Sequence, residues 1–156
     1  MDGEFAQVCG VSTGGESREA AASAAQLRMN ELTEESLAAF LDAFYVKVRS
    51  DPDLGPVFAA AIRDEAWPAH MTRIRDFWSS VMLKSARYKG NPFAAHIDRG
   101  VEQPHFKRWL ALFDETAAER FMPEIAAALS DRAHRIGASL QSGLFFRPHL
   151  MGGAPA

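Results

Sequence analysis

Apolar residues recur at helical spacing through most of the chain, and this periodicity sets the fold class. Thr33 is a good N-cap ahead of two glutamates, and the stretch that follows ends at Asp51-Pro52 with an apolar face of Leu37, Phe40, Leu41, Phe44, Tyr45 and Val48. The spacing predicts further helices from about Asp64 to Leu83, from Pro104 to Arg120 and from Pro123 onward, with a short one over Pro92 to Asp98. Residues 53–56 predict a turn. No segment alternates apolar and polar residues as a strand would, so we expect an all-α fold.

Length and composition narrow the class of protein. A chain of 156 residues fits one domain, and we expect a flexible arm over residues 1–29, a helical domain over 30–147 and a disordered tail over 148–156. The net charge of −3 argues against a nucleic-acid partner or an anionic membrane surface. Cys9 is the single cysteine, which excludes an internal disulfide and a thiolate metal cluster. The sequence has neither a membrane-length apolar run nor a secretory signal, so the cytoplasm is the expected compartment.

The common catalytic motifs are missing from the sequence. It has no glycine-rich phosphate loop, no CxxC and no zinc-binding HExxH. What stands out instead is polar rings on apolar faces: Tyr45, His70 and His96. Each alone is more often a core residue with a satisfied hydrogen bond, as Trp78 and Trp109 would also ordinarily be. Together, a wall carrying Tyr45, His70 and Trp109 opposite a short helix with His96 would form the flat apolar slot that haem requires.

These residues stand in motifs that resemble a known family. The chain is similar to the truncated haemoglobins, specifically the third bacterial group, over about Leu32 to Phe146. The resemblance rests on Ile74 and on FYVKVR at 44–49, DLGPVF at 53–58, WPAH at 67–70, FW at 77–78, YKGNPFAAH at 88–96 and HFKRWLALF at 105–113. The glycine pairs of other truncated globin groups are not evident here. The resemblance implies a truncated globin fold, a two-over-two helical sandwich around haem b.

The resemblance also implies roles for individual residues. His96 matches the position of the proximal iron ligand, and the YKGNP turn before it favours His96 over His105. Tyr45, His70 and Trp109 match distal positions that face the bound ligand, with His70 more suited to gating or hydrogen bonding than to ligating the iron. The cofactor-lining positions are Phe58, Ile74, Phe77, Trp78 and Phe93. Arg73 and Tyr88, with Lys84 and Arg87, are candidates for the haem propionates by position only, and a solvated charge is the ordinary alternative.

Chemistry adds two expectations to this family pattern. The other ring nitrogen of a haem-ligating imidazole is usually hydrogen-bonded, and we expect that of His96 to bond a backbone carbonyl, which sets its tautomer. The Tyr45 hydroxyl and the Trp109 indole N–H are both donors suited to a bound oxygen molecule, which predicts slow oxygen release.

Several functions are compatible with such a site. The leading hypothesis is a haem protein that binds oxygen, nitric oxide, carbon monoxide or peroxide. Nitric oxide oxidation or peroxide reduction would need a reductase partner, because the chain has no flavin or nicotinamide motif, and whether the protein is an enzyme stays open. One alternative is a non-enzymatic oxygen or redox sensor. Another is a haem-free helical interaction module whose histidines are ordinary core residues.

Overall fold

The computed structural model describes residues 28–96 and 99–145, and helices account for most of them. In chain order the elements are α2 (Glu34–Ser50), α3 (Leu54–Ala61), a 3₁₀ turn (Asp64–Ala66), α4 (Trp67–Leu83), α5 (Pro92–His96), α6 (Gln103–Arg120) and α7 (Pro123–Phe145). The described part of the chain holds no strand, only an isolated bridge between Met29 and Phe121. The prediction of an all-α fold is therefore confirmed. None of the described helices is long and apolar enough to cross a membrane.

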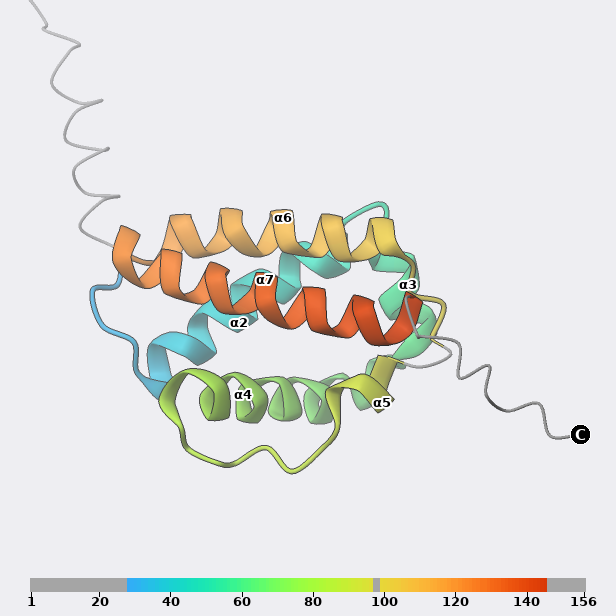
Figure 1. Ribbon diagram of the computed structural model, residues 1–156, viewed down its shortest axis with the longest axis horizontal. Coiled ribbons are helices and arrows are strands. Elements are labelled where there is room, and N and C mark those ends of the chain that lie inside the picture. The colour runs from blue at the N-terminus through green and yellow to red at the C-terminus, as the bar shows by residue number, and fades with distance from the viewer. Residues whose placement is uncertain (1–27, 97–98, 146–156) are drawn as a thin grey trace, which may run out of the picture.

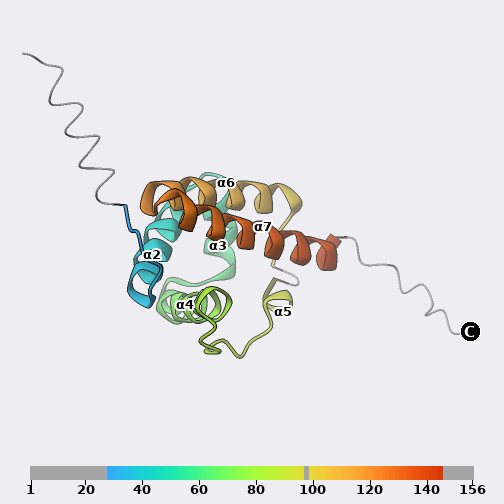
Figure 2. The ribbon, with the colours of Figure 1, turned by 60° about the vertical axis from the view of Figure 1, so that its left-hand side comes forward.

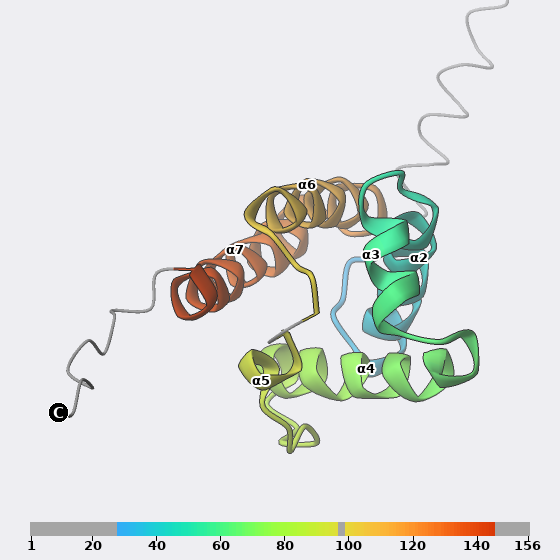
Figure 3. The same cartoon turned by 90° about the vertical axis from the view of Figure 1, so that its right-hand side faces the viewer.

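The helices form two layers. The antiparallel pair α6 and α7 lies on one side of the molecule, and α4 lies on the other, packed against α2 (Figure 1). Figure 3 shows α2 and α3 joining the two layers at one side of the molecule, while α5 contacts α7. In Figure 2, α5 lies below the C-terminal half of α7. This arrangement agrees with a two-over-two helical sandwich.

Helix α2 supplies the centre of the core. Thr33 caps it reciprocally with Ser36, since the Thr33 hydroxyl accepts from the Ser36 N–H at 3.1 Å and the Ser36 hydroxyl accepts from the Thr33 N–H at 2.8 Å. Phe40 packs edge-on against Phe113 of α6, with ring centroids 5.1 Å apart. All six residues of the predicted apolar face are buried: Leu37, Phe40, Leu41, Phe44, Tyr45 and Val48.

The prediction of a turn at residues 53–56 is wrong, because α3 begins at Leu54. Pro56 falls in the first helical turn, where backbone N–H groups have no partner within the helix, so its missing N–H costs nothing. The buried carboxylate of Asp51 accepts hydrogen bonds from the backbone N–H groups of Asp53 and Leu54, both at 3.0 Å. Arg108 of α6 holds the same carboxylate through two nitrogens at 2.8 Å. The start of α3 is thus fixed by Asp51, which is itself held by Arg108, 57 positions further along the chain.

Smaller differences concern the other boundaries. Helix α4 begins at Trp67 rather than near Asp64, because residues 64–66 form the 3₁₀ turn. Helix α5 is described as far as His96, and residues 97–98 lie outside the described part. Residues 1–27 of the predicted arm and the whole predicted tail, residues 148–156, also lie outside it, as do residues 146–147. Met29, placed in the arm by the sequence, pairs with the α6–α7 connection: its N–H donates to the Arg120 carbonyl and its carbonyl accepts from the Met122 N–H.

Candidate functional site

Tyr45 lies at the centre of the candidate site, buried on α2. Its ring packs against those of Phe44, Phe58, Trp67 and His70, with centroids 4.9 to 6.2 Å apart. Burial raises the pKa of the Tyr45 hydroxyl far above its ordinary value, and a side-chain hydrogen bond with Trp109 acts in the opposite direction. The hydroxyl therefore keeps its proton at neutral pH and can act as a hydrogen-bond donor.

Trp109 reaches this site from α6. It packs edge-on against Phe44 and stacks on Phe113, with centroid distances of 5.1 and 5.2 Å. An indole N–H can only donate, so in the bond with Tyr45 the phenol oxygen is the acceptor. That bond leaves the Tyr45 proton free for another acceptor.

His70 stands on α4, half-buried, with its ring centroid 6.0 Å from that of Tyr45. Its Nε2 is buried and has no hydrogen-bond partner among the described residues. Burial, and then the positive charge of Arg73 and the interaction with His96, lower the pKa of His70 to about 4. The imidazole is therefore neutral at physiological pH, and its Nε2 can still form a hydrogen bond with a bound group.

His96 ends the short helix α5. Its Nδ1 lies 2.6 Å from the carbonyl oxygen of Pro92, which makes Nδ1 the donor and leaves the lone pair on Nε2. The expected hydrogen bond to a backbone carbonyl is thus confirmed. The His96 ring lies 6.1 Å from the buried ring of Phe106. His96 is also close enough to His70 to contribute to the lowered pKa of His70.

Helix α4 carries two adjacent apolar stripes that are buried to different degrees. Met71 and Trp78 are buried, and Trp78 stacks on Phe113 with centroids 5.0 Å apart. His70, Ile74, Phe77 and Val81 lie at helical spacing on the next face and are only half-buried. The structure therefore separates Trp78, which lies in the core, from the two other predicted lining residues of α4.

The loop and helix after α4 bring two more predicted residues nearby. Tyr88 packs edge-on against Phe77 at 5.2 Å. Phe93 of α5 packs on Gly143 of α7 so closely that a Cβ on Gly143 would lie 2.6 Å from the Phe93 ring. Both aromatic side chains are half-buried, as is Phe58. Phe58 itself stands on α3, where its ring contacts those of Tyr45 and Trp67.

The predicted cations are all exposed on the protein surface. Arg73 is exposed on α4, one turn after His70. Lys84 is exposed and caps α4 in the left-handed conformation, with φ 57°. Arg87 pairs with Glu34 across 3.5 Å in an exposed position. Arg87 therefore has a partner of its own, whereas Arg73 and Lys84 form no ion pair with the residues that the structure describes.

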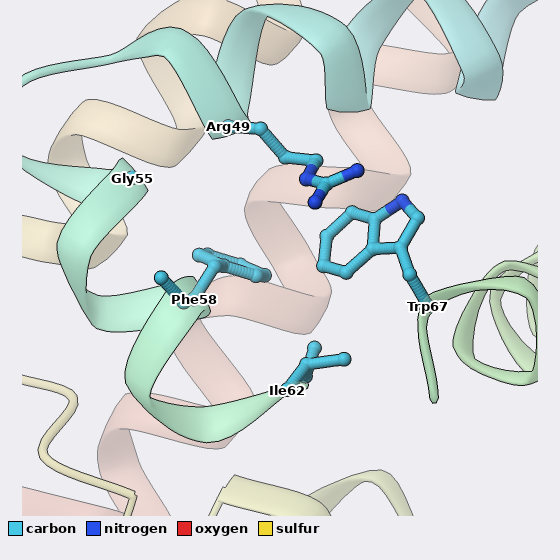
Figure 4. Close-up of a pocket in the computed structure, with 6 residues that line it drawn as sticks. Arg49, Gly55, Phe58, Ile62 and Trp67 are labelled. Carbon is cyan, nitrogen blue, oxygen red and sulfur yellow. The ribbon is translucent and has the colours of Figure 1, made fainter. Parts of the chain in front are cut away.

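Trp67 and Arg49 were not predicted as site residues. The Trp67 ring lies 5.0 Å from His70 and 6.2 Å from Tyr45, and the Arg49 guanidinium lies 4.3 Å above the centre of the Trp67 ring (Figure 4). The sequence held one signal for Trp67, since it precedes His70 by three residues and so shares its helix face. Arg49 gave none, because its partner lies on another element.

Comparison with known proteins places this arrangement in a family. No protein-family model matches the chain. A curated relative, a group 3 truncated hemoglobin of Campylobacter jejuni, is 34% identical over 122 residues, which cover 76% of this chain and 96% of the relative. The crystal structure of a group III truncated hemoglobin from Campylobacter jejuni superposes with a TM-score of 0.71 at 35% identity, covering 76% of this chain and 95% of that one. The chain therefore belongs to the group III truncated haemoglobins.

Proposed function

We propose that the protein binds haem through His96 and holds a diatomic gas molecule beside Tyr45 and His70. The observation that carries this proposal is the buried Nε2 of His70, which has no hydrogen-bond partner among the described residues. A buried polar atom left without a partner costs about 1–3 kcal/mol, so native structures rarely keep one without a use. A polar ligand next to His70 and Tyr45 would supply that partner.

The residues around this atom fit a flat apolar cofactor. His70, Ile74 and Phe77 form a half-buried stripe on α4, which a planar apolar group would cover. On α5, the His96 Nδ1–Pro92 bond directs the lone pair of Nε2 away from its own backbone, as a metal-ligating imidazole requires. The chain has one cysteine and hence no CxxCH attachment sequence, which supports a non-covalent haem b.

Each polar residue has a distinct task in this proposal. Haem iron supplies one coordination bond to an imidazole and one to a gas molecule. Tyr45 donates a hydrogen bond to the gas molecule, and Trp109 orients that hydroxyl by donating a hydrogen bond to its oxygen. His70 stays neutral and supplies Nε2 as a second polar contact. Because these groups lie among aromatic rings, their hydrogen bonds are stronger than in water, and we expect oxygen to leave slowly.

The ligands in this proposal are oxygen, nitric oxide, carbon monoxide or peroxide. A pocket with such donors suits chemistry on the bound molecule, either nitric oxide oxidation or peroxide reduction, with electrons from a separate reductase. The proposed compartment is the cytoplasm.

Absorption spectroscopy of the purified protein with haem tests the assignment of His96. We expect a Soret band that shifts on reduction and again on adding carbon monoxide, and we expect His96→Ala to lose haem or the imidazole-ligated spectrum. His105→Ala is the matched control, since His105 is the other histidine beside this region and serves to cap α6. If His96→Ala keeps the wild-type spectrum while His105→Ala loses it, the assignment is wrong. A wild-type protein that takes up no haem would favour the haem-free helical interaction module.

Stopped-flow measurement of oxygen release tests the distal residues. Tyr45→Phe removes one donor to a charged acceptor, worth about 1.5–3 kcal/mol, so the off-rate should rise on the order of tenfold to a hundredfold. Trp109→Phe should raise it less, because Trp109 acts through Tyr45. An unchanged off-rate in Tyr45→Phe would mean that Tyr45 does not contact the ligand.

A further inference from the structure

The segment between α4 and α5, residues 84–91, forms no helix or strand, yet side-chain hydrogen bonds hold it to the helices. Figure 1 shows this segment returning from the end of α4 to α5. Its attachment begins at Ser79 of α4, whose side chain is buried. The Ser79 hydroxyl oxygen lies 2.6 Å from the Glu34 carboxylate of α2 and 2.6 Å from the Ser85 hydroxyl oxygen. Helix α2, helix α4 and the segment are therefore joined at one polar cluster.

The direction of these bonds follows from the donors that are present. A carboxylate can only accept, so the single hydroxyl proton of Ser79 points to Glu34. Ser85 then donates its own proton to the Ser79 oxygen, and its oxygen accepts from the Arg87 backbone N–H at 3.4 Å. The Arg87 guanidinium also lies 3.5 Å from the second Glu34 oxygen. The bonds form a chain that ends on a charged acceptor, which makes them stronger than bonds between neutral groups.

The backbone shows what this chain of bonds holds in place. Lys84 and Ala86 both lie in the left-handed region, with φ 57° and 59°. Lys84 is the C-cap of α4, where this conformation is common. Ala86 lies two residues beyond the cap, and a residue with a Cβ adopts this conformation only at a cost in free energy. Because Ser85 stands between the two, its bond to Ser79 keeps the backbone in a conformation that it would otherwise leave.

The same segment leads to the proposed haem site. The Tyr88 N–H donates to the Ser80 hydroxyl of α4 at 2.8 Å, and the Tyr88 ring packs edge-on against Phe77 with centroids 5.2 Å apart. Phe77 belongs to the half-buried stripe of α4. Helix α5 follows directly and ends at His96. The placement of residues 84–91 therefore affects both Tyr88 and the start of the helix that carries His96.

We propose that Glu34, acting through Ser79 and Ser85, is a positioning residue for the segment that carries Tyr88 and leads to His96. The inference rests on the proposed function, because His96 is the iron ligand there. It gives a carboxylate at the start of α2, outside the proposed haem site, a part in keeping haem bound.

Amide hydrogen exchange in the haem-free, full-length protein tests this positioning role directly. Glu34→Ala and Ser79→Ala should each speed exchange of the Tyr88 amide several-fold, while the amides of α6 keep their rates. Glu35→Ala is the control for the first variant, since both glutamates lie in the first turn of α2 and interact alike with the helix dipole. Thr116→Val is the control for the second, since it removes a buried hydroxyl that bonds within α6. Unchanged exchange of the Tyr88 amide in Glu34→Ala and Ser79→Ala would overturn the proposal.

A second substitution separates positioning from a general loss of stability. Asparagine adopts the left-handed conformation more readily than alanine, and Ala86 is exposed, so Asn fits there. Ser79→Ala combined with Ala86→Asn should therefore regain part of the slow Tyr88 exchange. Exchange as fast as in Ser79→Ala alone would contradict the idea that the bond to Ser79 holds this backbone conformation.

Haem transfer to a competing apoprotein tests the consequence for His96. Glu34→Ala and Ser79→Ala should release haem several-fold faster and shift the iron–imidazole band in the resonance Raman spectrum of the reduced protein. Glu35→Ala and Thr116→Val should change neither. If Tyr88 exchange responds but haem release and the Raman band do not, the link to His96 is wrong. If the wild-type protein takes up no haem, the proposed function fails, and Tyr88 exchange still decides whether Glu34 positions the segment.

Discussion

Helices α2 and α4 are both 17 residues long and both carry an apolar face, yet they are buried very differently. In α2 the whole predicted face is buried, from Leu37 to Val48. Among the apolar residues of α4 only Met71 and Trp78 are buried, and the neighbouring stripe of His70, Ile74 and Phe77 is half-exposed. The apolar pattern alone does not distinguish the two helices.

The difference separates two uses of an apolar face. A residue of α2 gains its stabilisation within the protein, from rings such as Phe113. A residue of the half-buried stripe keeps part of its apolar surface exposed. Burial of that surface by a bound group would therefore stabilise the complex. We therefore expect substitutions on α2 to be costly in any state of the protein and substitutions on this stripe to be costly mainly when haem is present.

Phe40→Ala should give the largest effect. Phe40 is fully buried and contacts the rings of Phe44, Phe113 and Phe121, so its loss leaves a cavity in the core. Truncation of a buried phenylalanine costs about 3–5 kcal/mol of unfolding free energy. Urea unfolding of the haem-free protein measures this, and a loss below about 1 kcal/mol would contradict the role of α2 as the core helix.

Asp51→Asn should come next, at the end of α2. Burial alone would raise the pKa of Asp51, but hydrogen bonds from the Leu54 N–H, from Arg108 and from the Asp53 N–H outweigh it and lower the pKa. The loss of these charge-assisted bonds should cost about 1.5–3 kcal/mol at neutral pH.

The pH dependence follows from the sign of this shift. A carboxyl with a lowered pKa in the folded state stabilises the protein above its ordinary pKa, near pH 4, and this contribution is lost as pH falls through the folded pKa. Unfolding measured against pH should therefore show a shallower loss below about pH 4 in Asp51→Asn than in the wild type. Parallel profiles would contradict the assignment.

Phe77→Ala should have a smaller effect without haem. The ring is half-buried, so its truncation should cost the haem-free protein about 1 kcal/mol, well below Phe40→Ala. Haem transfer to a competing apoprotein should be faster from Phe77→Ala than from the wild type. If Phe77→Ala lowers stability as much as Phe40→Ala without haem, the distinction between the two helices fails.

His70 should give the smallest effect at neutral pH, and its contribution to stability changes in a separate, acidic pH window. Its pKa is about 4 in the folded chain, so between roughly pH 6.5 and 4 the unfolded imidazole takes up a proton that the folded one does not. Stability should therefore fall as pH falls through this window, and less so in His70→Gln. Proton NMR of the haem-free protein should show the His70 ring titrating near pH 4, and a midpoint near 6.5 would contradict its burial.

Apolar spacing in the sequence predicts correctly the helices whose apolar faces pack against other parts of the chain. The apolar stripe of α2 could be predicted because every residue on it packs into the core. On α4 the spacing merged Trp78, which packs on Phe113, with Phe77, which lies on the half-buried stripe, because neighbouring residues differ by only 100° around a helix. Only the surroundings in three dimensions separate them.

The residues that sequence reasoning missed depend on partners far along the chain. Helix α3 needs the Asp51 carboxylate, which in turn is held by Arg108 of α6. Arg49 covers Trp67 from another helix. By contrast, the His96–Pro92 bond spans one helical turn, and that local contact could be predicted from the chemistry of imidazole.

The position of His96 depends on the absence of a side chain at Gly143. The Phe93 ring occupies the space in which any side chain at residue 143 would begin. Phe93 and His96 share the five residues of α5, so a larger residue at 143 would push α5, and with it the imidazole, away from α7. The last turn of α7 thus sets how far α5, and with it His96, lies from α7. Natural variation at residue 143 would shift the His96 imidazole without altering any residue that contacts the ligand.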